Sequence, residues 1–203
     1  NRGKKQFSTT YNYTDAQNNN TTTIDNLENN LSIHKVQFEH KFGDFIQFNF
    51  EVSNAKNQLK SFNYSNRNYH LNNQTILPKL SYYYNSDAYF SISYELKNKE
   101  NTIENLETLN LKRLGMELNY SKSEKNTIKA DFNYFNNTFV GNSYSPVGYQ
   151  MLEGLQPGKN YTWSLLFFRN INSYLNLNIN YLGRKSETSS TIHTGSIQLK
   201  ALF

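Results

Sequence analysis

Apolar and polar residues alternate along most of this chain. In residues 45–52, for example, every second side chain is apolar: Ile46, Phe48, Phe50 and Val52. The same period of two recurs at 88–96, 114–120, 128–134, 175–181 and 197–203. Because successive side chains of a β-strand point to opposite faces, each segment is predicted to be a strand with one apolar and one polar face.

Extending these segments predicts about ten strands, over residues 4–14, 31–42, 45–60, 69–84, 88–98, 108–121, 126–139, 160–170, 173–185 and 190–203. Tight turns alternate with mostly longer polar loops, the first of which is expected over 15–30. In an antiparallel meander, this order places the tight turns at one end and the loops at the other. Pro78 falls inside a strand and lacks a backbone donor, so we expect a bulge or a strand end there.

Strand length distinguishes a soluble sandwich from a membrane barrel. Strands of soluble proteins usually have about 5–6 residues, whereas a tilted strand needs about 9–11 to cross a bilayer. Several strands predicted here are longer than ten residues, and their apolar faces are rich in Tyr and Phe. The sequence therefore predicts an all-β fold, an antiparallel up-and-down transmembrane β-barrel of about ten strands, possibly part of a larger barrel. Residues 1–203 are expected to form a single barrel domain, the C-terminal part of a longer chain.

Composition agrees with this interpretation. The mean hydropathy is −0.78, which is expected if only alternate residues face lipid. The chain has no Cys, which excludes disulfides and thiolate ligands. Its net charge is +5, but the basic residues are scattered along the chain and interleaved with acidic ones. We therefore expect no nucleic-acid partner.

The C-terminal segment 196–203, Ser-Ile-Gln-Leu-Lys-Ala-Leu-Phe, resembles the signal by which bacterial outer-membrane barrels are recognised for assembly. The resemblance implies that Ile197, Leu199 and Phe203 engage the barrel-assembly machinery, with Phe203 at the periplasmic rim. The tight turns then lie in the periplasm and the long loops outside the cell. The Asn- and Tyr-rich sequence, and the segment 145–163, also look similar to the C-terminal barrels of large envelope proteins of Flavobacterium-like Bacteroidetes.

Candidate catalytic and metal-binding residues are sparse. The four His residues show no His-x-His or Glu-x-x-His spacing. Ser186 to Ser190, with Glu187 and His193, is the only local set of the types used by surface hydrolases, and such common residues match by chance. We therefore expect that the protein is not an enzyme and has no metal or cofactor.

The segment 140–159 is unusually apolar for an external loop. It is expected either to fold back into the barrel mouth as a lid or to pack against a partner protein, since exposed apolar patches mark interaction sites. The residues expected to make this contact are Tyr149, Met151, Leu152 and Leu155.

The polar faces of the predicted strands carry charges of both signs. The expected lumenal network comprises Glu51, Lys79, Glu95, Arg113, Glu117, Lys129 and Asp131. Ten strands enclose a narrow lumen, which such paired charges would block. The sequence therefore favours an outer-membrane anchor or subunit of a multiprotein envelope complex for secretion or nutrient uptake. The alternative is a transport pore or part of a larger outer-membrane transporter. The expected partners are the lipid bilayer, lipopolysaccharide, the barrel-assembly machinery and other outer-membrane proteins.

Overall fold

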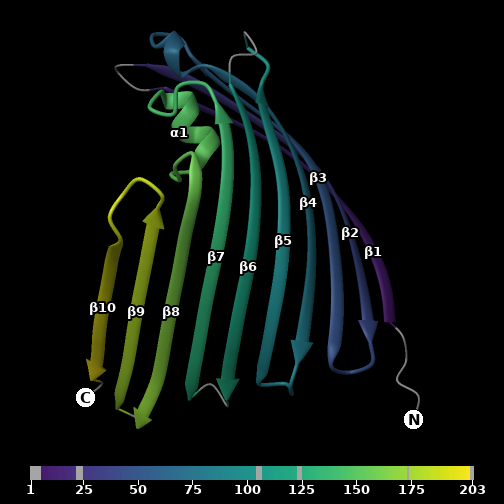
Figure 1. The fold of residues 1–203 in the computed structure, drawn as a ribbon, viewed down its shortest axis with the longest axis vertical. Helices are drawn as coiled ribbons and strands as arrows, with labels where there is room; N and C mark the ends of the chain where they lie inside the picture. Colours follow the sequence, from purple (N-terminus) through teal and green to yellow (C-terminus); the bar gives the residue numbers. More distant parts are fainter. Residues whose placement is uncertain (1–5, 22–24, 104–106, 123–124, 173, 202–203) are drawn as a thin grey trace.

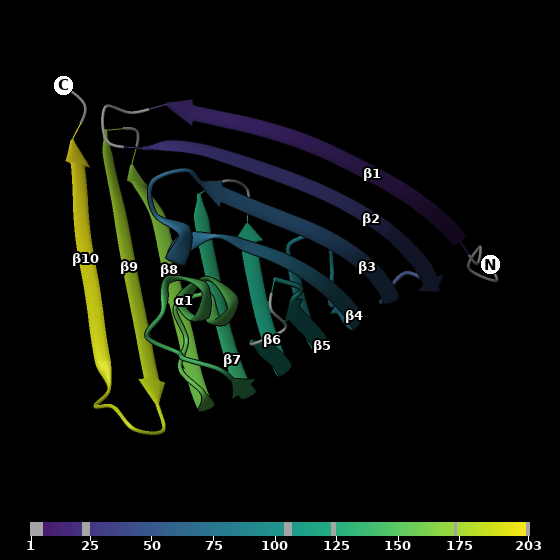
Figure 2. The same cartoon turned by 90° about the horizontal axis from the view of Figure 1, so that it is seen from above.

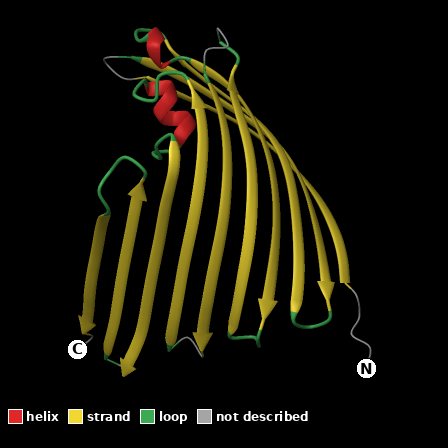
Figure 3. Ribbon diagram, viewed as in Figure 1, coloured by secondary structure: helices red, strands yellow, loops and turns green. Residues whose placement is uncertain are grey.

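The computed structural model describes residues 6–21, 25–103, 107–122, 125–172 and 174–201, which form ten strands and two short helices (Figures 1 and 3). The strands are β1 (Gln6–Thr21), β2 (Asn26–Phe42), β3 (Ile46–Ser61), β4 (Tyr69–Tyr83), β5 (Ala88–Asn101), β6 (Thr108–Lys122), β7 (Asn126–Val140), β8 (Gly158–Asn172), β9 (Leu175–Ser186) and β10 (Ile192–Ala201). The helices are the 3-10 helix η1 (Ser65–Arg67) and α1 (Pro146–Leu152). No helix in the described ranges is long and apolar enough to cross a membrane.

The strands form one antiparallel sheet in sequence order, β1 to β10. This confirms the predicted all-β, up-and-down architecture. The sheet curves into an arc, and α1 lies on its concave side (Figure 2). Among the described residues β1 and β10 are not paired, so the sheet is not closed. The ten strands are therefore an open arc and do not by themselves enclose the narrow lumen that the sequence suggested.

The prediction of a loop over residues 15–30 is wrong, because most of this segment is strand. β1 continues to Thr21 and β2 begins at Asn26, and the ladder runs from Asp15 opposite Ser32 to Thr21 opposite Asn26. The side chains here are almost all polar, so the apolar alternation stops. Backbone N–H and C=O groups pair regardless of that alternation, and the ladder continues beyond it.

The bulge or strand end expected at Pro78 is also absent, since β4 passes through it. The β4–β5 ladder omits Leu77 and Pro78, yet the pairs on either side, Ile76 with Leu96 and Lys79 with Ser93, keep one register. Pro78 remains opposite Phe50 on the other neighbour. A missing N–H thus interrupts one ladder without displacing the strand.

The lower half of the sheet, at the end of the tight turns, is apolar on its convex face. α1 packs on Leu109 and Leu111, so these side chains and those in register with them face the concave side. The opposite set forms an apolar band, which we define as the convex side chains of residues 36–42, 46–52, 76–82, 88–96, 114–120, 128–134, 161–167 and 175–181. Its large side chains, such as Leu80 and Met116, are exposed.

The upper half, at the end of the longer loops, has the reverse polarity. There several concave side chains are apolar and buried, next to charged ones such as Lys99, and the convex face is polar at Asn110 and Lys112 on β6. We call the buried cluster the upper core: Tyr69, Leu71, Leu109, Leu111, Val147, Met151 and Leu152, with Leu59, Phe135 and Phe139 packed against it. On β6 the change of face falls between Leu111 and Leu114, whose odd spacing puts them on opposite sides of the sheet.

Candidate functional site

The concave face and the loop that covers its upper part form the candidate site. We call residues 145–155 the helical ledge, because they fold into α1 and its termini. Ser145 begins the helix by accepting a hydrogen bond from the backbone N–H of Gly148 (2.9 Å), with Pro146 in the first turn. Glu153 ends the helix in a left-handed conformation, with φ 53°. Sequence patterning missed this helix because it has only seven residues.

The ledge is attached to the wall by its apolar side. Val147, Met151 and Leu152 are buried in the upper core, and Met151 has no exposed surface. Tyr149, on the other side of the helix, is 68% exposed, and Leu155 is half-buried. The structure therefore separates the four residues that were expected to make one contact. Met151 and Leu152 are buried against the wall, Tyr149 is exposed on the other side of the helix, and Leu155 is half-buried. Their roles as lid or partner contact stay predictions.

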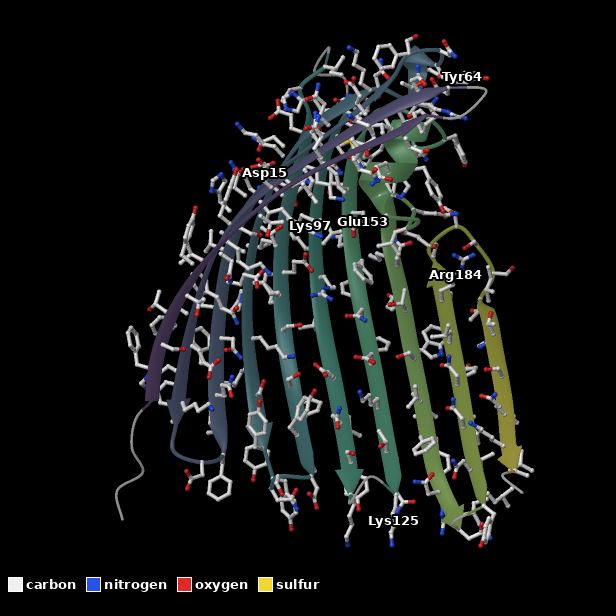
Figure 4. All side chains as sticks on the ribbon, turned by 180° about the vertical axis from the view of Figure 1, so that it is seen from behind. Asp15, Tyr64, Lys97, Lys125, Glu153 and Arg184 are labelled. Carbon is white, nitrogen blue, oxygen red and sulfur yellow. The ribbon has the colours of Figure 1, made fainter. Side chains whose placement is uncertain are left out.

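An ion-pair cluster holds the C-terminal end of the ledge (Figure 4). Lys99 donates to the carbonyl oxygen of Met151 (2.8 Å) and pairs with Glu153 (2.6 Å). Lys97 lies between Glu153 (3.4 Å) and Glu95 (3.0 Å). Arg113 extends the cluster to β6, with its Nε 2.8 Å from Glu95 Oε2. Two lysines of β5 thus converge on one carboxylate of the ledge, and Glu95 links them to Arg113 of β6.

The protonation of Glu153 follows from this environment. Desolvation by burial raises the pKa of Glu153, but the hydrogen bond and charge of Lys99 and the charge of Lys97 outweigh it, so the net pKa is lowered. A lowered pKa keeps the carboxylate ionised at neutral pH, when it can hold both lysines. The contact is therefore complete above the ordinary Glu pKa and is lost as the pH falls through the lowered one.

A second group of charges lies lower on the concave face. Glu117 pairs with Lys79 (2.7 Å), and it accepts hydrogen bonds from the hydroxyls of Tyr89 and Ser91. Because Lys79 is on β4 and Glu117 on β6, this pair crosses over β5. Glu51 of β3 makes a separate pair with Lys35 of β2 (3.1 Å).

The predicted lumenal network is therefore divided into separate groups along the wall. Asp131 accepts a hydrogen bond from Ser164 (2.9 Å), and Lys129 forms no ion pair among the described residues. Three members of the ledge cluster, Lys97, Lys99 and Glu153, were not part of the predicted network. Lys99 shares the face of Glu95 and Lys97, which is a signal that could have identified it.

The other predicted residues lie away from this face. Ile197 and Leu199 are exposed on the convex side of β10, and Phe203 lies outside the described residues. Ser186 faces the concave side, where it donates to Asn160 (2.8 Å), whereas His193 contacts the hydroxyl of Tyr181 on the convex side (2.7 Å). The local hydrolase set is thus not assembled. Within the described ranges, no group of three or more His, Cys, Asp or Glu residues could hold a metal ion.

Comparison with known proteins identifies the fold. No protein-family model and no curated protein sequence matches the chain. Three solved structures of the outer-membrane protein OmpT of Vibrio cholerae are similar. The form expressed in the outer membrane has a TM-score of 0.53 and 9% identity, and the match covers 82% of this chain and 52% of that one.

The two other OmpT structures agree. The in-vitro folded form has a TM-score of 0.51 and 10% identity over 84% of this chain and 53% of that one. A mutant without loop L8 has a TM-score of 0.56 and 10% identity over 92% and 62%. The chain thus has an outer-membrane β-barrel fold and spans about half the length of the first two OmpT chains.

This similarity corrects the prediction that the protein is not an enzyme. The OmpT match, at 9–10% identity, places the chain in an outer-membrane fold class and shows the fold alone. One fold can host enzymes and proteins of other functions, and it does not decide among them. Excluding enzymatic activity was therefore wrong.

Proposed function

We propose that the chain forms part of the wall of a transport barrel in the bacterial outer membrane, and that the complete barrel has more than ten strands. One observation carries this proposal. The sheet is an open arc with an apolar band on its convex face and polar, charged residues on the concave face at the same height. This distribution suits lipid on one side and water on the other.

The height of the apolar band supports a bilayer location. On β6 the band extends from Leu114 to Tyr120, which at 3.3 Å per residue is about 20 Å along the strand. Outer-membrane barrels have a comparable band, about 25 Å tall, flanked by aromatic girdles. Aromatic side chains occur at both borders here, with Tyr82 and Tyr120 at the lower one and Tyr134 and Tyr161 at the upper one.

The open edges support a wider lumen. Unpaired edge strands expose backbone donors and acceptors, which the hydrocarbon region of a bilayer does not tolerate. We therefore infer that further strands pair with β1 and β10, and a barrel wider than ten strands leaves room for water. The paired charges then lie along one wall without filling the lumen, and the helical ledge narrows its upper mouth.

Conductance of the complete protein in planar bilayers tests this proposal. We expect stable ion conductance. Replacing the concave Lys35 (K35E) should shift the reversal potential in a salt gradient toward cation selectivity, because a positive charge of the wall is reversed. The matched convex variant Lys60→Glu should not shift it. A folded, membrane-inserted protein that conducts no ions would contradict the proposal.

Exposed aromatic side chains on the ledge and directly before it favour a second candidate, an anchor or subunit of an envelope complex for secretion or uptake. Tyr144 is 95% exposed and Tyr149 is 68% exposed, and Tyr is enriched at protein interfaces. We expect a stoichiometric partner when the native protein is purified from outer membranes in mild detergent, and its loss in a Tyr144→Ser/Tyr149→Ser variant. A monomer without co-purifying protein would contradict this candidate. An origin in the Bacteroidetes and recognition by the assembly machinery stay predictions.

A further inference from the structure

Three exposed lysines lie immediately above the apolar band on its convex side. Lys112 of β6 and Lys159 of β8 are both in register with Asn136 of β7 between them. Lys185 of β9 is in register with Tyr161, the next convex residue below Lys159. Because strands are about 4.8 Å apart, Lys112 and Lys159 are attached about 10 Å apart on one surface. We call Lys112, Lys159 and Lys185 the lysine row.

The lysine row coincides with the upper aromatic border. Tyr134 is the next convex residue below Asn136 on β7, and Tyr161 is the next one below Lys159 on β8. The ring centroids of these two tyrosines are 5.2 Å apart. Trp163 and Tyr181 continue the border, and the indole N–H of Trp163 donates to the hydroxyl of Tyr181 (3.3 Å). Aromatic belts of this kind sit at headgroup level. The ammonium groups are thus placed where the charged headgroups of the adjacent leaflet begin.

The charge of the lysine row is not neutralised by the protein in the way that the concave charges are. Lys79, Lys97 and Lys99 on the concave face each pair with a carboxylate. None of the three row lysines pairs with a carboxylate of the described residues. The nearby Glu187 accepts a hydrogen bond from the backbone N–H of Lys159 (3.0 Å) and leaves the row with a net positive charge.

We propose that the lysine row, with the amide of Asn136, binds the phosphate groups of a diphosphorylated glycolipid in the outer leaflet. This inference rests on the outer-membrane location in the proposed function and on the orientation predicted from the sequence, in which the longer loops lie outside the cell. Two ammonium groups on strands about 10 Å apart can each approach a different phosphate of one headgroup, and the Asn136 side chain can donate between them. The apolar band directly below would receive the acyl chains.

The test uses the complete protein, purified from outer membranes and transferred to nanodiscs, with binding followed by native mass spectrometry. The probe is purified diphosphoryl lipid A, compared with monophosphoryl lipid A, phosphatidylglycerol and inorganic phosphate. For a Lys112→Gln/Lys159→Gln variant we expect affinity for diphosphoryl lipid A to fall by roughly tenfold or more, since each lysine contributes to attraction by an anionic headgroup. The monophosphoryl lipid should bind more weakly than the diphosphoryl lipid to the unaltered protein and lose less affinity in the variant.

A matched control removes the same number of positive charges at the lower end of the sheet. Lys122 and Lys125 lie at the lower end of β6 and in the β6–β7 turn (Figure 4 labels Lys125). A Lys122→Gln/Lys125→Gln variant should keep its lipid A affinity. Equal affinity in the row variant and the unaltered protein, or equal losses in both variants, would overturn the inference. So would equally strong binding of phosphatidylglycerol or full competition by inorganic phosphate. Conductance of the row variant should be unchanged, which separates failure of this site from failure of the proposed pore.

Discussion

The lower and upper halves of the sheet are built from the same strands with opposite polarity. On β6, Leu114, Met116 and Leu118 face outward in the lower half, while Leu109 and Leu111 face inward in the upper half. In the first set Met116 and Leu118 are exposed and Leu114 is half-buried, whereas the second set is buried under the helical ledge. A single strand thus carries two apolar surfaces, one buried by the protein itself and one that faces lipid in the barrel proposed above.

This difference shows how a loop becomes part of a barrel wall. Where water is present on both faces of a sheet, apolar side chains are stable only if protein covers them. The ledge supplies that cover with Met151 and Leu152, and Lys99 ties it to β5. In the lower half the convex face has no such cover, and in the proposed barrel lipid takes its place.

The largest expected effect comes from removing the centre of the upper core. Met151→Ala should lower the free energy of unfolding by about 2–5 kcal/mol through lost burial and a cavity, and should expose the ledge to protease. Tyr149→Ala, on the exposed side of the same helix, is the control and should change stability little. Denaturant unfolding and limited proteolysis measure both. Equal effects of the two variants would mean that the ledge does not depend on the wall.

A charge on the convex face should distinguish the two halves directly. Met116→Arg, within the apolar band, should destabilise the folded protein in lipid vesicles by about 2–4 kcal/mol, the cost of a basic side chain near the bilayer midplane. Asn110→Arg changes the same face of the same strand in the upper half and should cost close to nothing. Equal stability of the two variants in lipid vesicles would contradict the division of the convex face into an apolar lower half and a polar upper half.

The border between the halves can be tested at Gly183. A Cβ at this position would lie 2.0 Å from the Trp163 ring, whereas one at Gly195 would meet nothing closer than 3.8 Å. Gly183→Val should therefore displace the indole and cost about 1–3 kcal/mol by overpacking, and Gly195→Val should leave it in place. Trp163 is the only Trp of the chain, so its fluorescence reports the displacement. An unchanged emission spectrum in Gly183→Val would contradict this packing.

The smallest expected effect is on the pH dependence of the ledge. The lowered pKa of Glu153 predicts that the ledge is held firmly above pH 4.5, the ordinary value for Glu, and loosens as the pH falls below it. The groups that face this carboxylate are Lys97 and Lys99, with Glu95 and Arg113 behind them. Glu153→Gln should remove part of the acid-induced increase in proteolysis, worth about 0.2–1 kcal/mol for each partly exposed ion pair. An identical pH profile in both proteins would exclude Glu153 as the titrating group.

The number and order of the strands could be predicted from the sequence, because alternation reports which faces of a strand meet different environments. Every predicted strand lies close to a strand of the structure, as β6 shows at Thr108–Lys122 against the expected 108–121. The prediction failed where alternation carries no information. The polar ladder from Asp15 to Thr21 was expected to be a loop, because both of its faces lie in water.

The candidate site was predicted in part. The face on which Glu95, Arg113 and Glu117 lie follows from strand period alone. Their partners do not: Lys79 reaches Glu117 across an intervening strand, and Glu153 reaches Lys97 and Lys99 from a helix more than fifty residues away along the chain. The reversal of polarity between Leu111 and Leu114 was visible in the sequence, but it has a meaning only when the cover over the upper half is known.

The amino-acid sequence by itself determined the strands, their antiparallel order and the apolar and polar faces of the lower half, because these depend on local side-chain period and short connections. Only the tertiary structure decided that the ten strands form an open arc, that residues 145–155 fold as a ledge on the concave side, and which charges pair. Curvature and packing depend on contacts between residues far apart in sequence. A period of two specifies which side of the sheet a residue faces, and it does not specify what lies opposite.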